Sequence, residues 1–142
     1  MTPEKDIIIA KNREHLQYIV HQYLHSQGPE CDLNHIDVSQ ITDMSHLFNG
    51  LDYQGSIDKW NTANVKKMAF MFKESSFNND ISSWNVSNVK NMARMFEYAK
   101  FNGSIEKWNT SNVEIMNGMF YGSDFKGCTM QWDTSNVQDM QS

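Results

Sequence analysis

Apolar residues return along most of this chain at a fixed step of 24 positions. Self-similarity at a period of this length is typical of solenoid proteins, in which stacked coils bury a shared core. The pattern therefore predicts an α/β repeat solenoid with its apolar columns inside. These columns are Trp60, Trp84, Trp108 and Trp132; Val65, Val89, Val113 and Val137; Met44, Met68, Met92, Met116 and Met140; Phe48, Phe72, Phe96 and Phe120; and Tyr53, Phe77, Phe101 and Phe125.

Two local patterns alternate within each unit. The apolar residues of the segment 89–98 lie at positions i, i+3, i+6 and i+7, which predicts a short helix with Asn88 as its N-cap. The segment 101–110 has turn residues followed by a short extended stretch, which predicts a brief strand near residues 105–108. A strand and a short helix in each coil is the architecture of leucine-rich repeats, so the predicted fold is leucine-rich-repeat-like.

Residues 1–30 do not follow the repeat and carry a different pattern. The apolar run 7–10 predicts a short strand. Apolar residues then recur at i, i+3, i+4, i+7 and i+8 over residues 16–24, which predicts an amphipathic helix with Asn12 as N-cap and Gly28 near its C-terminal cap. The end of a solenoid exposes apolar surface, so we expect this segment to form an N-terminal cap.

The repeat array is expected to cover residues 31–142 in four to five coils. A degenerate half-repeat over residues 31–41 begins it, and a last helical half starts at Val137 and stops at Ser142. No second cap pattern follows this last half. We therefore expect either a longer protein or an end that packs on another molecule, for which an end-to-end homodimer through the C-terminal coil is one arrangement.

Composition and charge narrow the classes of partner. Of the 142 residues 39% are hydrophobic and 20% are charged, with a net charge of −5, which is an ordinary globular composition. No basic run neutralises a phosphate backbone, so no nucleic acid is expected as partner. No apolar run approaches the ~20 residues of a membrane span, so no transmembrane segment is expected. The apolar run 7–10 is too short for a signal peptide, which by itself favours a cytoplasmic location.

Residue types that carry chemistry are present but do not form a recognisable set. His21 and His25 have the i, i+4 spacing of a zinc pair, but we favour exposed histidines because no Glu follows His21. Asp80 has no carboxylate in neighbouring units, so a calcium site is not favoured. Cys31 and Cys128 lie at opposite ends of the array, so two free thiols are expected. We expect no enzyme, no cofactor and no metal.

Two polar columns have two open explanations, a ligand groove or hydrogen bonds to turn backbone, and we favour the second. These are Asn61, Asn85 and Asn109, and Asn64, Asn88, Asn112 and Asn136. Binding residues are expected instead at exposed positions of the strand half, which line up as one stripe if the strands stack. We name this set the stripe; it comprises Asp58, Lys59, Ser82, Ser83, Glu106, Lys107, Met130 and Gln131.

The repeat also resembles a known family. The string Phe-Asn-x-x-Ile-x-x-Trp-Asn-x-Ser-Asn-Val-x-x-Met-x-x-Met-Phe, at residues 77–96 and 101–120, is similar to the repeat of BspA-like bacterial surface proteins. That repeat is also called the mycoplasma lipoprotein-associated repeat and is grouped with leucine-rich repeats. The resemblance covers about residues 31–142 and implies a non-catalytic protein-binding module, adhesin-like and at the cell surface or secreted, with a protein or host-matrix partner.

Three alternatives to this implied function stay open. Because no secretion signal is visible, an intracellular partner-binding protein is the first alternative. A structural spacer domain that joins or presents other domains is the second. A metal-dependent enzyme that uses His21 and His25 is the most remote.

Overall fold

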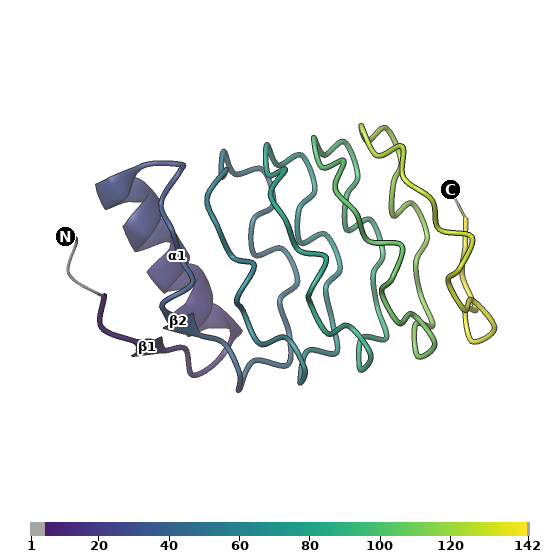
Figure 1. The fold of residues 1–142 in the computed structure, drawn as a ribbon, viewed down its shortest axis with the longest axis horizontal. Coiled ribbons are helices and arrows are strands. Elements are labelled where there is room, and N and C mark those ends of the chain that lie inside the picture. Colours follow the sequence, from purple (N-terminus) through teal and green to yellow (C-terminus); the bar gives the residue numbers. More distant parts are fainter. Residues whose placement is uncertain (1–4, 142) are drawn as a thin grey trace.

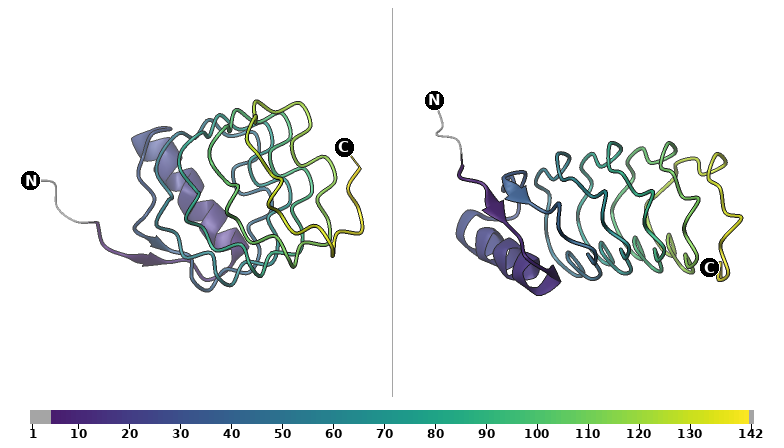
Figure 2. Two further views of the ribbon diagram at one scale, coloured as in Figure 1. Left: turned by 45° about the vertical axis from the view of Figure 1, so that its right-hand side comes forward. Right: turned by 90° about the horizontal axis from the view of Figure 1, so that it is seen from below.

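The computed structural model describes residues 5–141. Its named elements are β1 (Ile8–Ile9), α1 (Arg13–Gln27) and β2 (Ile36–Asp37). The rest of the described chain runs as a series of coils that lie side by side along the long axis, and α1 lies across the N-terminal end of the series (Figures 1 and 2).

The N-terminal helix forms where the sequence predicts it, with both predicted caps. The side chain of Asn12 accepts a hydrogen bond from the backbone N–H of His15 at 2.8 Å, which satisfies a free donor of the first turn. At the other end Gly28 has a φ of 88°, and its N–H donates to the Leu24 carbonyl at 3.0 Å. One face of the helix is buried through Leu16, Ile19 and Val20.

The predicted N-terminal strand is also confirmed, in a shorter form. Strand β1 pairs in parallel with β2, and Ile8 lies opposite Ile36. The N–H of Ile8 donates to the His35 carbonyl at 3.1 Å, and the N–H of Ala10 donates to the Asp37 carbonyl at 3.0 Å. The segment before α1 is therefore bonded to the first coil, so strand and helix together cover its outer side.

The coils are joined by single-residue parallel bridges. Asp43 pairs with Lys67, Lys67 with Asn91, Asn91 with Ile115, and Ile115 with Asp139. Each bridge joins residues that are 24 positions apart. The step predicted from the apolar columns is therefore the step at which neighbouring coils stack.

The short helix predicted over residues 89–98 is wrong, because that segment is a run of turns. The N–H of Met92 donates to the Ile115 carbonyl of the next coil at 2.8 Å, whereas the N–H of Met95 donates three residues back to Met92 at 3.2 Å. Arg94 has a φ of 52°, which no α-helix contains. Six of the ten backbone N–H groups of this segment thus donate to a neighbouring coil rather than within the segment.

The brief strand predicted near residues 105–108 is wrong as well. Glu106 and Lys107 form a turn, closed by a hydrogen bond of 3.1 Å from the N–H of Trp108 to the Ile105 carbonyl. After β2, each coil within the described residues is therefore built from turns and one bridge in place of a strand and a helix.

Aromatic rings stack from coil to coil through the core. Phe48 and Phe72 lie 5.5 Å apart between ring centroids, as do Phe72 and Phe96, with interplanar angles of 2° and 3°. Such pairs add about 0.5–1.5 kcal/mol to the free energy of burial. Burial decreases towards the C-terminal end: Phe120 is only half-buried, and Met140 is 57% exposed.

The two cysteines lie apart, with Cys31 buried and Cys128 exposed, and both are free thiols. No helix within residues 5–141 has the length and apolar character that crossing a membrane requires.

Candidate functional site

The stripe predicted for binding forms a column of turns rather than of strands. The turns comprise Asp58–Lys59, Ser82–Ser83, Glu106–Lys107 and Met130–Gln131. Ser83 donates through its hydroxyl to the Asp58 carbonyl at 3.1 Å, and Asn34 donates through its amide to the Asp58 carboxylate at 3.0 Å. Adjacent coils therefore place the stripe residues side by side. Asp58 and Glu106 are half-buried, whereas the other six members are exposed.

The asparagine columns bond the backbone of turns, as favoured from the sequence. Asn88 donates through its side-chain amide to the Ala63 carbonyl of the preceding coil at 2.6 Å, and Asn112 donates to the Ser87 carbonyl at the same distance. In the other column, the Asn85 side chain accepts from the N–H of Ser87 at 3.0 Å. Asn88 is not a helix N-cap, because no helix follows it. The Asn88 and Asn112 amides therefore join neighbouring coils, whereas the Asn85 side chain stabilises its own turn.

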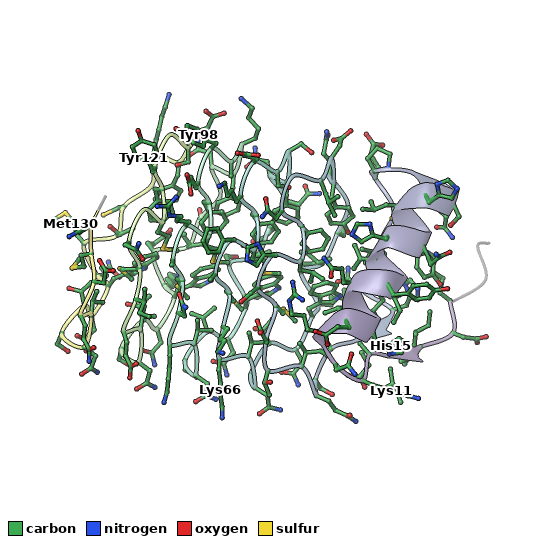
Figure 3. The ribbon with its side chains drawn as sticks, turned by 180° about the vertical axis from the view of Figure 1, so that it is seen from behind. Lys11, His15, Lys66, Tyr98, Tyr121 and Met130 are labelled. Carbon is green, nitrogen blue, oxygen red and sulfur yellow. The ribbon has the colours of Figure 1, made fainter. Side chains whose placement is uncertain are left out.

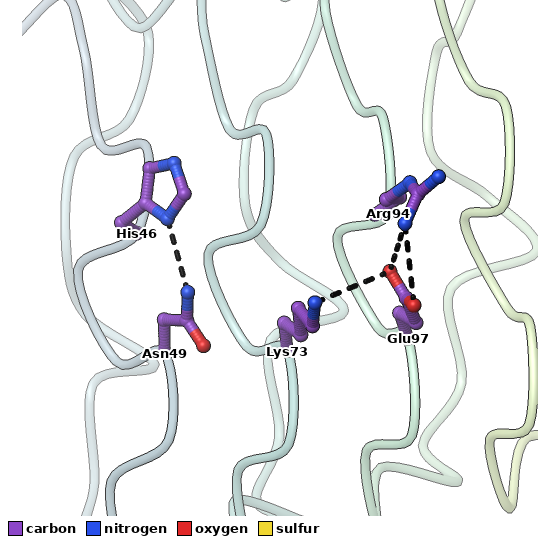
Figure 4. Close-up of polar contacts among 5 residues, drawn as sticks. All are labelled: His46, Asn49, Lys73, Arg94 and Glu97. Atoms are coloured by element: carbon purple, nitrogen blue, oxygen red, sulfur yellow. Dashed lines mark hydrogen bonds and ion pairs between the residues drawn. The ribbon is translucent and has the colours of Figure 1, made fainter.

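A charged cluster on another wall of the coils was not predicted from the sequence. Glu97 is only 6% exposed, yet it carries a carboxylate. One of its oxygens lies 3.8 Å from the Lys73 ammonium of the preceding coil and 3.4 Å from the Arg94 guanidinium (Figure 4). A carboxylate taken out of water needs such partners. In the sequence these residues occupied the polar face of an expected helix, so no signal marked Glu97 as buried.

A polar pocket of about 280 Å³ adjoins this cluster. It is lined by Arg94, Glu97, Asn117, Gly118, Tyr121 and Gln141, so no stripe residue lines it. Tyr121 also meets Tyr98 edge to face with ring centroids 5.5 Å apart, and both rings are about half exposed. Figure 3 shows these two tyrosines together at one edge of the molecule, opposite Lys66.

An apolar groove of about 360 Å³ lies at the C-terminal end of the stack. Its walls include Met116, Phe120, Trp132 and Met140, which are members of the core columns. Met130, at the same end of the molecule (Figure 3), is 91% exposed. The last column members thus form surface where earlier members form core.

The histidines divide into two groups. His21 and His25 are exposed on α1, as favoured from the sequence. Within residues 5–141 no three His, Cys, Asp or Glu side chains gather closely enough to hold a metal ion. His35 differs from His21 and His25, because both of its ring nitrogens are buried and neither has a hydrogen-bond partner within residues 5–141. Burial lowers the pKa of His35, and the nearby Lys5 ammonium lowers it further.

The Asp80 carboxylate stabilises the turn in which it lies. Its carboxylate accepts hydrogen bonds from the Ser82 N–H at 2.9 Å and from the Ser82 hydroxyl at 2.6 Å. These bonds favour the charged form and hold the pKa of Asp80 below its usual value. The carboxylate is thus engaged in a local turn, which is the ordinary explanation for an Asp in this position.

Comparison with known proteins gives one match. The family described as "Mycoplasma protein of unknown function, DUF285" matches residues 18–126 and 97–142. No curated protein and no solved structure matches the chain significantly.

Proposed function

We propose that this chain, which belongs to the Mycoplasma protein family of unknown function DUF285, is a non-catalytic protein-binding module. Its stacked coils support a place among repeat solenoids of the leucine-rich-repeat-like class, with turns and bridges in place of helices. The motif at residues 77–96 and 101–120 supports a closer relation to the repeats of BspA-like surface proteins.

The arrangement of the stripe carries this proposal. The interior columns repeat the same residues because stacked rings and chains require them, whereas the stripe changes from Asp58–Lys59 to Ser82–Ser83 and to Glu106–Lys107. These turn side chains are not needed to fill the core. Hydrogen bonds between coils hold two of them, Asp58 and Ser83, in place, and polar groups on a rigid framework bind with little loss of conformational entropy.

The location that best fits the resemblance is the bacterial surface or the secreted state, with an adhesin-like role and a host-matrix protein as partner. An intracellular partner-binding protein and a structural spacer are the alternatives. Protease treatment of intact cells separates the surface location from the intracellular one: a surface protein is cleaved at its exposed turns, whereas an intracellular protein survives until the cells are lysed.

Binding through the stripe is tested with two variants of matched charge. The first replaces two stripe residues, Lys59→Glu and Lys107→Glu; the control makes the same change at two exposed lysines elsewhere, Lys66→Glu and Lys90→Glu. Wild type and both variants are passed over a panel of purified extracellular-matrix proteins in surface plasmon resonance. We expect saturable binding by wild type and control.

In the stripe variant we expect binding to weaken by about tenfold or more, which corresponds to roughly 1.4 kcal/mol. Equal binding by the two variants would exclude the stripe as the contact surface. Saturable binding to none of the panel would reject the matrix-binding role.

A further inference from the structure

One column on the wall that carries Lys73, Arg94 and Glu97 has a glycine as the last member that the described residues 5–141 include. Its members are His46, Phe70, Arg94 and Gly118, with φ values of 63°, 60°, 52° and 62°. The N–H of each donates to a carbonyl of the next coil, at 3.0, 2.9, 2.9 and 2.6 Å respectively. The four positions therefore share one backbone geometry and differ in the side chain alone.

The second position of this column shows how an aromatic ring fits there. The Phe70 ring stacks on the His46 ring of the preceding coil, with centroids 4.6 Å apart and an interplanar angle of 7°. The Lys73 ammonium lies 5.8 Å from the centroid of the same Phe70 ring. At this position the Phe70 ring therefore contacts the flat His46 ring of the preceding coil and the side chain of Lys73, three positions further along the chain.

The fourth position, Gly118, has no side chain and borders a pocket. A Cβ atom added to Gly118 would lie 3.2 Å from Cγ and 3.9 Å from Nε of Arg94, so the Arg94 side chain runs directly beside the missing one. The pocket of about 280 Å³ described above occupies this place, and Tyr121 forms part of its lining. Relative to Gly118, Arg94 holds the position in the preceding coil that His46 holds relative to Phe70. Tyr121 lies three positions after Gly118, as Lys73 lies three positions after Phe70. We name this pocket the Gly118 slot.

We propose that the Gly118 slot receives an aromatic side chain of a partner protein, in the position that Phe70 occupies two coils earlier. A guanidinium attracts the face of a ring within about 6 Å of its centroid, and Tyr121 offers an edge-to-face contact. Tyr and Arg are also the residue types that most often dominate protein–protein interfaces. This inference rests on the proposed protein-binding function and adds the chemistry of one contact.

The charges around the slot favour a ring over an anion or an aliphatic group. The Arg94 guanidinium is already paired with the Glu97 carboxylate at 3.4 Å, and a second anion would approach that same buried carboxylate. An aliphatic side chain would fill the volume but would gain nothing from the guanidinium or from the Tyr121 ring. A neutral ring gains from both.

The test uses the whole chain, labelled with ¹⁵N, and N-acetyl-phenylalaninamide as probe in an NMR titration. We expect saturable shifts at the amides of Arg94, Glu97 and Asn117, which line the slot and not the apolar groove, and binding of N-acetyl-leucinamide that is roughly fivefold weaker. Equal affinity for the two probes would overturn the proposal. So would shifts confined to the apolar groove around Trp132.

Gly118→Phe should abolish these shifts, because the introduced ring fills the slot as Phe70 fills its own. Phe70 has a φ of 60° at the equivalent position, so this backbone geometry accepts a phenylalanine there, and the Arg94 side chain must move slightly because its Cγ lies 3.2 Å from an added Cβ. Gly50→Phe is the matched control: this glycine also has a positive φ of 71°, and no atom lies within 4 Å of an added Cβ. Full binding by Gly118→Phe, or loss in the Gly50→Phe control, would overturn the proposal.

Arg94→Gln tests the same proposal if the Gly118→Phe variant does not fold. We expect roughly fivefold weaker probe binding with the amide spectrum otherwise preserved. Unchanged affinity would overturn the proposal. The probe binds without a protein partner, so this titration does not depend on the stripe. If the stripe variants bind like wild type, the slot proposal is unaffected, and if the probe does not bind, the stripe proposal is unaffected.

Discussion

The indole nitrogen of Trp84 donates a hydrogen bond to the backbone carbonyl of Ile57 at 3.0 Å. The same bond joins Trp108 to Ile81 at 3.2 Å and Trp132 to Ile105 at 3.1 Å. Each bond crosses from one coil to the preceding one. The tryptophan column therefore fills the core and also supplies hydrogen-bond donors to backbone carbonyl groups that do not belong to a helix or an extended sheet.

Trp84→Ala should therefore lower the free energy of unfolding by about 3–5 kcal/mol, the cost of truncating a buried tryptophan. Trp84→Phe should cost less, because it keeps most of the apolar contact and loses the bond to Ile57. Urea denaturation monitored by far-UV circular dichroism measures both. A loss well below 1 kcal/mol for Trp84→Ala would contradict the inward position of this column.

Asn88→Asp tests the direction of the hydrogen bonds between turns. The side-chain amide of Asn88 donates to the Ala63 carbonyl, so a carboxylate there removes the donor and faces a carbonyl oxygen. We expect a loss of about 1–2 kcal/mol in the free energy of unfolding. Asn78→Asp is the control, because Asn78 accepts from the N–H of Asn102 at 2.8 Å and a carboxylate can do the same. Equal losses in both would contradict the assignment.

Glu97→Gln tests the buried charged cluster. It removes the charge that Lys73 and Arg94 share and should lower the free energy of unfolding by about 1–3 kcal/mol. The exposed Glu74 provides the comparison, and Glu74→Gln should stay within about 0.5 kcal/mol of wild type. Thermal denaturation of both variants measures the difference; a neutral Glu97→Gln would mean that the ion pairs do not stabilise the stack.

His35 should make the protein less stable in mild acid. Burial and the Lys5 ammonium lower its pKa in the folded state, while Asp32 opposes this. The unfolded chain therefore takes up this proton first. The free energy of unfolding is unaffected well above the ordinary pKa of 6.5 and falls as the pH drops below it.

Replacement of His35 by Phe, which can keep the edge contact with the Tyr23 ring, should remove this share of the pH dependence. Urea denaturation of wild type and variant at several pH values between 7.5 and 5 measures it. An identical pH dependence in the two proteins would show that His35 is protonated equally well in both states.

The apolar groove at the C-terminal end leads to a prediction about assembly. An end-to-end homodimer through this coil should appear as a mass that rises with concentration in size-exclusion chromatography with light scattering. Polar substitutions Val137→Ser and Met140→Ser should abolish it, whereas Lys66→Glu should not. A monomer at every concentration would reject this dimer.

Much of the fold could be predicted from the sequence because it depends on local patterns. Helix α1 was predicted with both its caps, since Asn12 and Gly28 act on backbone within a few residues of themselves. The stacking step and the inward tryptophan column followed from the repetition itself. That the asparagine columns bond turn backbone was also predicted, because turns in every coil need such hydrogen bonds, although Asn88 donates to the Ala63 carbonyl instead of capping a helix.

The path of each coil could not be predicted, because it is decided by partners in the neighbouring coil. The apolar spacing of residues 89–98 suits a helix, and it suits equally a run of turns whose alternate N–H groups leave the segment. Met92 bonds Ile115, and Arg94 bonds Asn117, each 23 positions further along the chain. No local pattern shows such a bond.

The same distinction holds for the candidate sites. The sequence by itself determined which stripe positions recur, since a column needs only the repeat. Only the tertiary structure decided that these positions are turns, that Glu97 is buried between two cations, and that Gly118 leaves a slot beside Arg94. Each of these depends on which side chains from adjacent coils meet, and that is set by stacking in space rather than by order along the chain.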